Sequence, residues 1–426
     1  MLDRRYIGTV AITNVGKMVS GDFYKGILKA DTILVKDGII DKIGWAKDFD
    51  LSKVDHVIDV QGQVVCPGFI DMHVHNTIDD YQSMASTMRW MESYLWYGIT
   101  TILSEGEQGP GYPRFFNDPI GTKAMAIVAK RVFDNFRPGG FQKFRGGALV
   151  LVDGLTEADF EEMAQAGVWM VAEIGGGGLY KVKDVAPMIE WAKPRGFKVS
   201  VHIGPQSIPG SSLVGSELCV AIQPDKLAHI NGGSTAAPWS EIQRCIDECP
   251  KAGVEFISMG NQKMAGRIYE YLQTRNELNR VVYGSDTPTG QGVMPNCIQR
   301  MVMRAAAFHD VPPEQAIAMG TGNSADLYGL NTGKIEVGRE ADILAIDSGY
   351  DATGEDALEA MKLDDTFGVS MVMVDGQVVS VKGRDGRPTK RHITIDGVPT
   401  YIDNINEYLF GPYFPGYLPK KNGKVA

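Results

Sequence analysis

The sequence has little cysteine, little histidine and no long apolar run, and two of these shortages exclude a class of protein. Five Cys, an odd number scattered over 426 residues, do not form the disulfide framework of a small secreted protein. No segment approaches the roughly 18 uninterrupted apolar residues that a membrane helix needs. Residues 1–20 lack an apolar stretch followed by a small-residue cleavage site. We therefore expect a soluble, cytoplasmic protein with reduced thiols and no membrane partner.

An excess of positive charge is also missing. The chain carries 42 Lys and Arg against 52 Asp and Glu, which gives a formal net charge of −10. Nucleic acid would require a basic face, so we expect no nucleic-acid partner. Hydrophobic residues make up 44% of the chain, and this ordinary fraction excludes disorder as the dominant state. Because there are only 7 His, their positions are informative.

The sequence pattern near both ends of the chain is typical of short strands. Segments rich in Val, Ile and Thr recur before residue 66 and again over 334–383, and Asp37-Gly38 and Asp375-Gly376 are typical of hairpin turns. We expect residues 1–66 and 334–383 to assemble into one small β-sandwich domain.

The centre, residues 67–333, alternates between apolar strand-like runs and helical stretches. The runs are nearly continuous, as in strands buried on both faces. The eight expected strands are 68–75, 98–105, 148–153, 168–174, 198–203, 227–230, 254–259 and 281–286. Eight such units over about 265 residues predict an α/β fold, a (β/α)8 TIM-like barrel that forms the catalytic domain. The rival, a doubly wound open sheet, is weakened because no Gly-x-Gly-x-x-Gly opens a first helix.

The tail, residues 384–426, begins with basic residues and continues with six aromatic ones. We expect this aromatic arm to pack on something, because so many exposed rings would aggregate. Its own barrel, a subunit contact and a cover over the active site all remain open.

The first barrel strand carries two imidazoles on one face. In Pro67-Gly68-Phe69-Ile70-Asp71-Met72-His73-Val74-His75, residues 71, 73 and 75 point to the same side of the strand. His73 and His75 can therefore grip one divalent cation. His-x-His alone is a weak signal, but its place after Pro-Gly-Phe-Ile-Asp makes it strong.

Four further candidates end later strands, where barrel enzymes place their working residues. Glu173 ends the fourth strand, His202 the fifth, His229 the sixth and Asp286 the eighth. Taken singly, Glu173 could be a surface residue or a helix cap. His202 or His229 alone could be a hydrogen-bonded residue of the core. Taken together, the six residues predict two metal shells of imidazole and oxygen, which suit Zn, Fe, Mn or Co.

Two other motifs carry less weight. Cys245 and Cys249 are four residues apart on an expected helix and could in principle grip a metal, but burial in a barrel's outer ring is the simpler interpretation. The segment Gly175-Gly176-Gly177-Gly178 resembles a glycine-rich phosphate-binding loop. No Lys-Ser/Thr follows it, so we interpret it as a flexible loop beside the site.

At this point the pattern resembles the amidohydrolase superfamily. The segment 67–75, the strand-end His202 and His229, and Gly284-Ser285-Asp286 are similar to its metal-binding series, and 333–342 is similar to its return into the sandwich. A narrower resemblance, to a branch that hydrolyses cyclic enamides, rests on short phrases at 167–169, 208–212, 229–233 and 321–333. Many members bridge two metals with a carboxylated Lys on strand four. This chain has no Lys there, and the resemblance implies that Glu173 takes its place.

The resemblance implies a hydrolase of a cyclic amide, either lactam or enamide, with two divalent ions (Zn and/or Fe) and a homotetrameric assembly. A hydroxide bridging the ions would attack the amide carbon, with Asp286 as proton shuttle.

Two alternatives stay open. A mononuclear deaminase of the same superfamily would carry a Glu three residues after the strand-five His, where this chain has Pro205. A catalytically inactive scaffold relative would usually have lost metal ligands.

Overall fold

The computed structural model describes residues 7–75, 93–106, 118–135, 142–206, 211–233, 235–288, 292–381 and 386–400. These residues fall into two compact units. The strand–helix unit takes the described residues of Ile70–Glu92 and Thr101–Met301. The sheet unit takes those of Leu2–Phe69, Ser93–Thr100 and Val302–Ala426.

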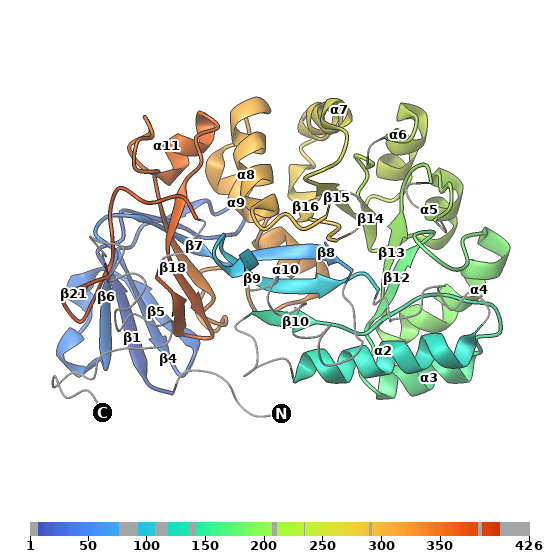
Figure 1. The fold of residues 1–426 in the computed structure, drawn as a ribbon, viewed down its shortest axis with the longest axis horizontal. Coiled ribbons are helices and arrows are strands. Elements are labelled where there is room, and N and C mark those ends of the chain that lie inside the picture. The colour runs from blue at the N-terminus through green and yellow to red at the C-terminus, as the bar shows by residue number, and fades with distance from the viewer. Residues whose placement is uncertain are drawn as a thin grey trace. The chain divides into compact units, whose positions relative to one another are not determined.

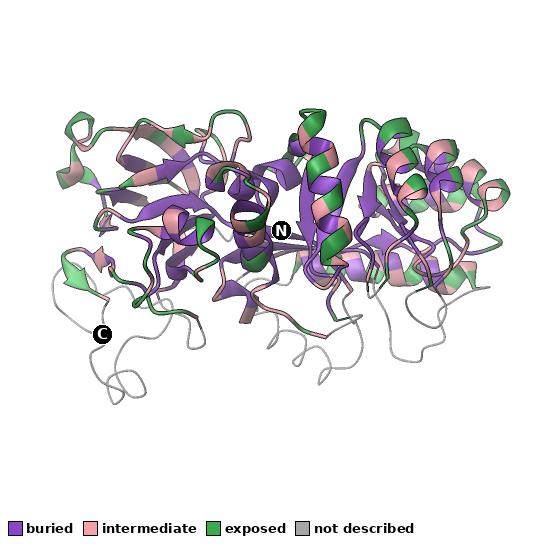
Figure 2. Ribbon diagram, turned by 90° about the horizontal axis from the view of Figure 1, so that it is seen from above, coloured by how far each residue is buried: buried purple, intermediate pink, exposed green. Residues whose placement is uncertain are grey.

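The strands between Phe69 and Gly284 form two sheets, and β8, β9, β12, β15 and β16 are buried along their whole length (Figures 1 and 2). A three-stranded sheet has the order β10-β9-β8, and a six-stranded sheet runs from β11 to β16 in chain order with every pairing parallel. Burial on both faces explains why their sequences are continuously apolar. The strands are β8 (Phe69–Val74), β9 (Ile99–Ser104), β10 (Lys143–Arg145), β11 (Ala148–Leu149), β12 (Met170–Ile174), β13 (Lys198–His202), β14 (Lys226–Ala228), β15 (Gly253–Ile257) and β16 (Val281–Gly284).

The third expected strand, 148–153, is wrong in detail. The described chain has two short strands in this region, and only Ala148–Leu149 of the expected range is a strand. Gly147 lies between them with a φ of +95°, a conformation that interrupts an extended run. Consecutive strands β10 and β11 therefore belong to different sheets, and the ring of described strands is not closed there. An isolated parallel bridge does join Val74, which ends β8, to Thr287 after β16.

Helices alternate with these strands, as in a TIM-like α/β fold, and consecutive helices from α2 to α6 are neighbours (Figure 1). Polar side chains cap several of them: Asp118 accepts from Gly121 N at the start of α2, and Asn261 from Met264 N at the start of α7. The helices are α2 (Pro119–Asp134), α3 (Glu157–Gln165), α4 (Val182–Ala192), α5 (Ser216–Ile222), α6 (Trp239–Glu248), α7 (Gln262–Thr274) and α8 (Cys297–Phe308), with 3-10 turns at Lys193–Arg195 and Leu278–Arg280.

The short helix α5 was not predicted, because seven residues give too little periodicity to recognise. The alternating pattern of the centre also predicts a helix over 85–97, and most of this segment lies outside the described residues. None of the described helices is both long and apolar enough to cross a membrane.

The sheet unit contains two six-stranded sheets, with the orders β21-β20-β6-β1-β4-β5 and β19-β18-β17-β7-β2-β3. The second joins the two ends of the chain directly, because β7 pairs antiparallel with β17. The strands are β1 (Thr9–Thr13), β2 (Lys17–Val19), β3 (Ile27–Leu28), β4 (Thr32–Lys36), β5 (Ile39–Gly44), β6 (His56–Asp59), β7 (Val64–Pro67), β17 (Ile343–Asp347), β18 (Gly368–Val374), β19 (Gln377–Ser380), β20 (Thr394–Ile395) and β21 (Val398–Pro399). The accompanying helices are α9 (Pro313–Met319), α10 (Gly322–Tyr328) and α11 (Ala357–Lys362), with 3-10 turns at Ala46–Asp48 and Leu51–Lys53.

Both predicted hairpin turns are confirmed. Asp37 and Gly38 join β4 to β5 with φ values of 50° and 78°, and Asp375 and Gly376 join β18 to β19 with 50° and 77°. Positive φ at both central residues is the geometry that suits the twist of hairpin strands and that Asp-Gly favours.

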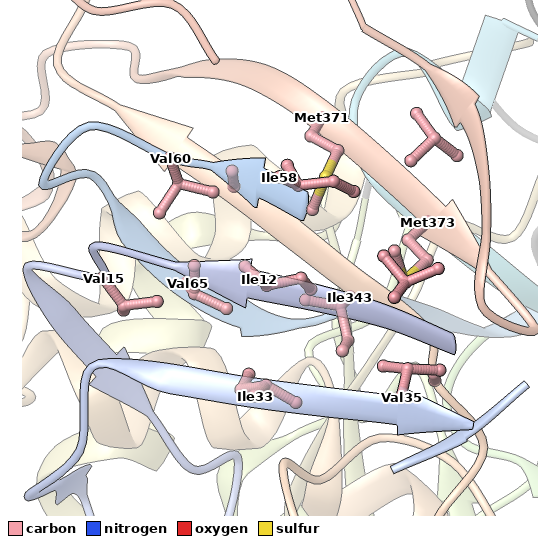
Figure 3. Close-up of a cluster of buried hydrophobic side chains, with 14 of the residues drawn as sticks. Ile12, Val15, Ile33, Val35, Ile58, Val60, Val65, Ile343, Met371 and Met373 are labelled. Carbon is pink, nitrogen blue, oxygen red and sulfur yellow. The ribbon is translucent and has the colours of Figure 1, made fainter. Parts of the chain in front are cut away.

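The two sheets of this unit contribute side chains to one hydrophobic cluster (Figure 3). Ile12 and Ile33 come from the first sheet, and Val65, Ile343 and Met371 from the second; all five are fully buried. Burying such side chains contributes about 1.5–3 kcal/mol each to folding. Residues far apart in the sequence therefore share one core in this unit.

The start of the tail also belongs to the sheet unit. Strand β20 pairs antiparallel with β6, and Asp396 Oδ2 lies 2.8 Å from His56 Nδ1. Arg391 donates from Nε and Nη2 to Asp347 at 3.0 and 2.5 Å, and from Nη1 to Gly62 O at 2.7 Å. The aromatic residues predicted to form an arm lie beyond residue 400, outside the described residues.

Arg391→Ala should destabilise the protein clearly, because it strips the counterion from Asp347, whose side chain is fully buried. Loss of one partner of a buried pair costs about 3–5 kcal/mol, and the one-third exposure of Arg391 places this pair at about 3 kcal/mol. Lys362→Ala is the control: it breaks an exposed pair with Glu359 and should cost under about 1 kcal/mol. Urea unfolding measures both. Equal losses would contradict the assignment of a structural role to Arg391.

Candidate metal centre

All six candidate residues lie at or just beyond the carboxyl ends of parallel strands. His73 is in β8 and His75 follows it, Glu173 is in β12, and His202 ends β13. His229 and Asp286 come one and two residues after β14 and β16. The structure brings the six together in the strand–helix unit.

His73 and His75 face each other and one oxygen of Glu173. Their Nε2 atoms are 3.1 Å apart, and Glu173 Oε2 lies 3.6 Å from the first and 3.5 Å from the second. Asp286 Oδ1 lies 3.6 and 3.2 Å from the same two nitrogens. We call His73, His75 and Glu173 the first trio.

The second trio is Glu173, His202 and His229. Glu173 Oε1 is 2.7 Å from His202 Nδ1 and also contacts His229 Nε2. In each trio the donor atoms lie within 4.8 Å of one another. The two oxygens of Glu173 are therefore divided between two pairs of imidazoles.

The donor set fits divalent cations. His73 Nδ1 is engaged with Glu255 Oε2 at 2.8 Å, so Nε2 is the nitrogen that faces His75 and Glu173 and could serve as the metal ligand. Two imidazole nitrogens and carboxylate oxygens converging on one point suit Zn or Fe. Among the described residues, the groups that could hold a metal are these two trios, and neither contains a Cys. Cys245 and Cys249 are free, buried thiols, which agrees with the expectation that they are structural residues of a helix.

The carboxylates of the site carry negative charge at neutral pH. Burial opposes ionisation of Glu173, but the adjacent His229 and His202 outweigh it and hold its pKa well below the usual range. Burial likewise opposes ionisation of Asp286, but a hydrogen bond from His75 and the charges of the surrounding imidazoles hold its pKa at about 2. In return, Glu173 raises the pKa of His229 against the effect of burial. Such mutual stabilisation of charge is typical of functional sites.

The backbone around two candidates has positive φ, +31° at His229 and +56° at Asp286, which is costly for residues with a Cβ. Hydrogen bonds hold both in place: Asp286 N donates to His73 O at 2.8 Å, and His229 N to Glu255 Oε2 at 2.9 Å. Asp71 adds a link between β8 and the segment after β16. Its Oδ1 accepts from His73 N and from Ser285 N, at 3.1 and 2.9 Å.

The glycine loop after β12 closes against Glu173. A Cβ at Gly176 would lie 2.5 Å from Glu173 Oε2, and one at Gly178, whose φ is +70°, would collide with Leu151 O. The loop is therefore beside the site, as predicted, and it needs glycine in order to approach the carboxylate.

Sequence reasoning missed a cluster of three charged residues next to this site, of which Glu255 alone touches the candidate ligands: Lys226 in β14, Glu255 in β15 and Glu105 after β9. All three side chains are completely buried. The signal was available, since a charged residue inside an otherwise apolar strand is almost never fully buried unless it is paired. Their partners lie on other strands, however, and sequence spacing does not identify them.

Comparison with known proteins identifies a family to which the chain is similar. A sequence model of the Amidohydrolase family matches residues 268–379. Enamidase from Eubacterium barkeri is 42% identical over 380 residues, which cover 89% of this chain and 97% of that protein. A crystal structure of enamidase, described as a new member of the amidohydrolase superfamily, has a TM-score of 0.85 and covers 91% of this chain and 100% of its own. A D-hydantoinase structure shares the fold with a TM-score of 0.62 at 16% identity, covering 90% and 99%.

Gly176→Ala should weaken metal binding at least about 10-fold, because the new methyl group pushes the Glu173 carboxylate away from its position between the trios. Gly233→Ala is a matched control, since a Cβ there meets nothing within 4 Å and should change affinity little. Zinc affinity by chelator competition measures both. Two alanine variants with wild-type affinity would show that the carboxylate does not depend on the loop.

Proposed function

Because the chain belongs to the amidohydrolase superfamily and shares 42% identity with enamidase, we propose that it is a metal-dependent hydrolase that opens a cyclic amide. The observation that carries this proposal is the division of Glu173 between two imidazole pairs, with the ionised Asp286 beside the first. The enamidase likeness favours a cyclic enamide over a simple lactam.

In this proposal His73, His75 and Asp286 would hold one cation and His202 and His229 the other, with Glu173 as a ligand that the two would share. The donor set of imidazole nitrogens and carboxylate oxygens, without thiolate, supports zinc, iron or both. When bound, the cations would lower the pKa of a shared water from 15.7 towards about 7 and polarise the amide carbonyl.

Asp286 is the proton shuttle of the reaction. Its carboxylate is ionised, and Oδ1 lies among the imidazoles, 3.2 Å from His75 Nε2, where it can accept a proton from the attacking water. It returns that proton to the ring nitrogen as the C–N bond breaks, so acid and amine are released and the carboxylate is regenerated. If the ring is an enamide, the freed enamine tautomerises to an imine, and a second water releases ammonia and an aldehyde.

The two alternatives receive less support from the site. A mononuclear deaminase would use an acid three residues after His202, whereas Pro205 offers only its backbone oxygen, 3.3 Å from His202 Nε2. The convergence of all six candidate metal ligands favours an active enzyme over an inactive scaffold, which would usually have lost some of them.

We also propose the finer architecture of the family: a closed (β/α)8 barrel over residues 67–333 and a β-sandwich from 1–66 and 334–383, to which the first described part of the 384–426 tail adds β20 and β21. The joining of β7 with β17 and the cluster shared by two sheets support the sandwich. The bridge between Val74 and Thr287 supports closure of the ring. A cytoplasmic homotetramer acting on a small molecule is the assembly that goes with this proposal.

Glu173→Gln should reduce bound metal from about two ions per chain towards one, because an amide offers one neutral oxygen in place of two charged ones. Metal analysis of the purified protein measures this, and the melting temperature of the metal-free protein controls for folding. An unchanged metal count with an unchanged rate would remove the bridging role of Glu173.

Asp286→Asn should lower kcat by about 10²- to 10⁴-fold, the usual contribution of a general acid–base group. The assay compares a cyclic enamide with the matching saturated lactam: ammonia is expected from the enamide alone. Ammonia released from an exocyclic amine without ring opening would instead support the deaminase. No hydrolysis of any cyclic amide by the metal-loaded protein would overturn the proposed function.

A further inference from the structure

Next to the two trios, the buried side chains of Lys226, Glu105 and Glu255 form a charged cluster that has no part in the proposed reaction. Lys226 Nζ contacts Glu105 Oε1, donates to Glu255 Oε1 at 2.8 Å and donates to Met72 O at 3.1 Å. All three charged side chains have no exposed surface. Buried charges are costly to desolvate, so such a cluster calls for an explanation beyond stability.

Glu255 differs from Glu105 in what else it touches. Its Oε2 accepts from His73 Nδ1 at 2.8 Å and from the backbone N–H of His229 at 2.9 Å. One carboxylate oxygen therefore holds the ring of a first-trio histidine and the backbone of a second-trio histidine. The His229 backbone is also the one with a φ of +31°.

The contact between Glu255 and His73 requires a glycine at position 284. A Cβ at Gly284 in β16 would lie 2.5 Å from Glu255 Oε1 and would collide with His73 Cβ. No larger residue fits between the two side chains without moving one of them. The neighbouring strand is thus shaped around the pair.

We propose that Glu255 is the positioning residue of the metal centre: it fixes His73 with Nε2 free for a cation and fixes His229 in its unusual backbone conformation. Lys226 serves as the counterion that keeps Glu255 charged. This inference rests on the proposed function, because it assigns Glu255 to the centre that would hold the metals.

The two acids of the cluster provide a matched pair of variants. In Glu255→Gln, Lys226 keeps Glu105 as its partner; in Glu105→Gln, Lys226 keeps Glu255. Each variant therefore leaves one buried ion pair, and neither leaves Lys226 without a carboxylate. Only the first removes the carboxylate that touches the histidines.

The test is zinc affinity by chelator competition, together with the visible absorption spectrum of the cobalt-substituted protein. Glu255→Gln should weaken affinity about 10- to 100-fold, the cost usual for removing a histidine's outer partner, and should shift the cobalt bands. Glu105→Gln should change affinity by less than about 3-fold and leave the bands in place. Equal effects of the two substitutions would reduce the cluster to a stability element and overturn the proposal.

A second variant covers the case in which Glu255→Gln does not fold. Glu255→Asp keeps the charge but draws the carboxylate back by one methylene, so it should also weaken zinc binding by 10-fold or more. Wild-type affinity in a folded Glu255→Asp protein would contradict the positioning role. A wild-type protein that binds no zinc would instead refute the proposed function, so the two failures are distinguishable.

Discussion

The carboxylate of Glu173 is the contact on which the centre depends. One oxygen faces His73 and His75, and the other faces His202 and His229. Four imidazoles from the ends of three strands, β8, β13 and β14, converge in a buried space around this negative charge. A two-oxygen ligand at the end of β12 supplies that charge and links the two trios into one centre. Asp286 extends it on the side of the first trio.

The surrounding chain is arranged to keep that geometry. Gly176 allows the loop after β12 to close on Glu173, and Gly284 leaves room for Glu255 beside His73. Asp71 links the backbone at His73 and Ser285. The contacts of Asp71 and Gly284 join segments that are far apart in sequence, and all three contacts constrain a candidate ligand or its backbone. The centre is therefore built by the interior of the strand–helix unit as a whole.

Much of this could be predicted because strand ends are visible in a sequence. His73, His75, Glu173, His202 and Asp286 each close an apolar run, and a parallel arrangement brings such ends together. The Asp-Gly hairpins were also recognisable, since their backbone conformation is local.

What was missed depends on contacts between distant residues. Glu255 and His73 are 182 residues apart, and nothing in the spacing pairs them. The split of the third strand into β10 and β11 follows from Gly147 and from which neighbour each piece can reach, and α5 is too short to show a helical period. In the tail, Arg391 belongs to the sheet unit through the buried Asp347, a role that a run of basic residues does not reveal.

The most direct test of the central claim is an anomalous difference map from crystals of the native protein, measured at the zinc and iron absorption edges. The account predicts two peaks, one within bonding distance of His73 and His75, the other within bonding distance of His202 and His229, and both about 2.0–2.2 Å from Glu173 oxygens. A single peak that Glu173 does not touch, or no peak at these side chains, would contradict it.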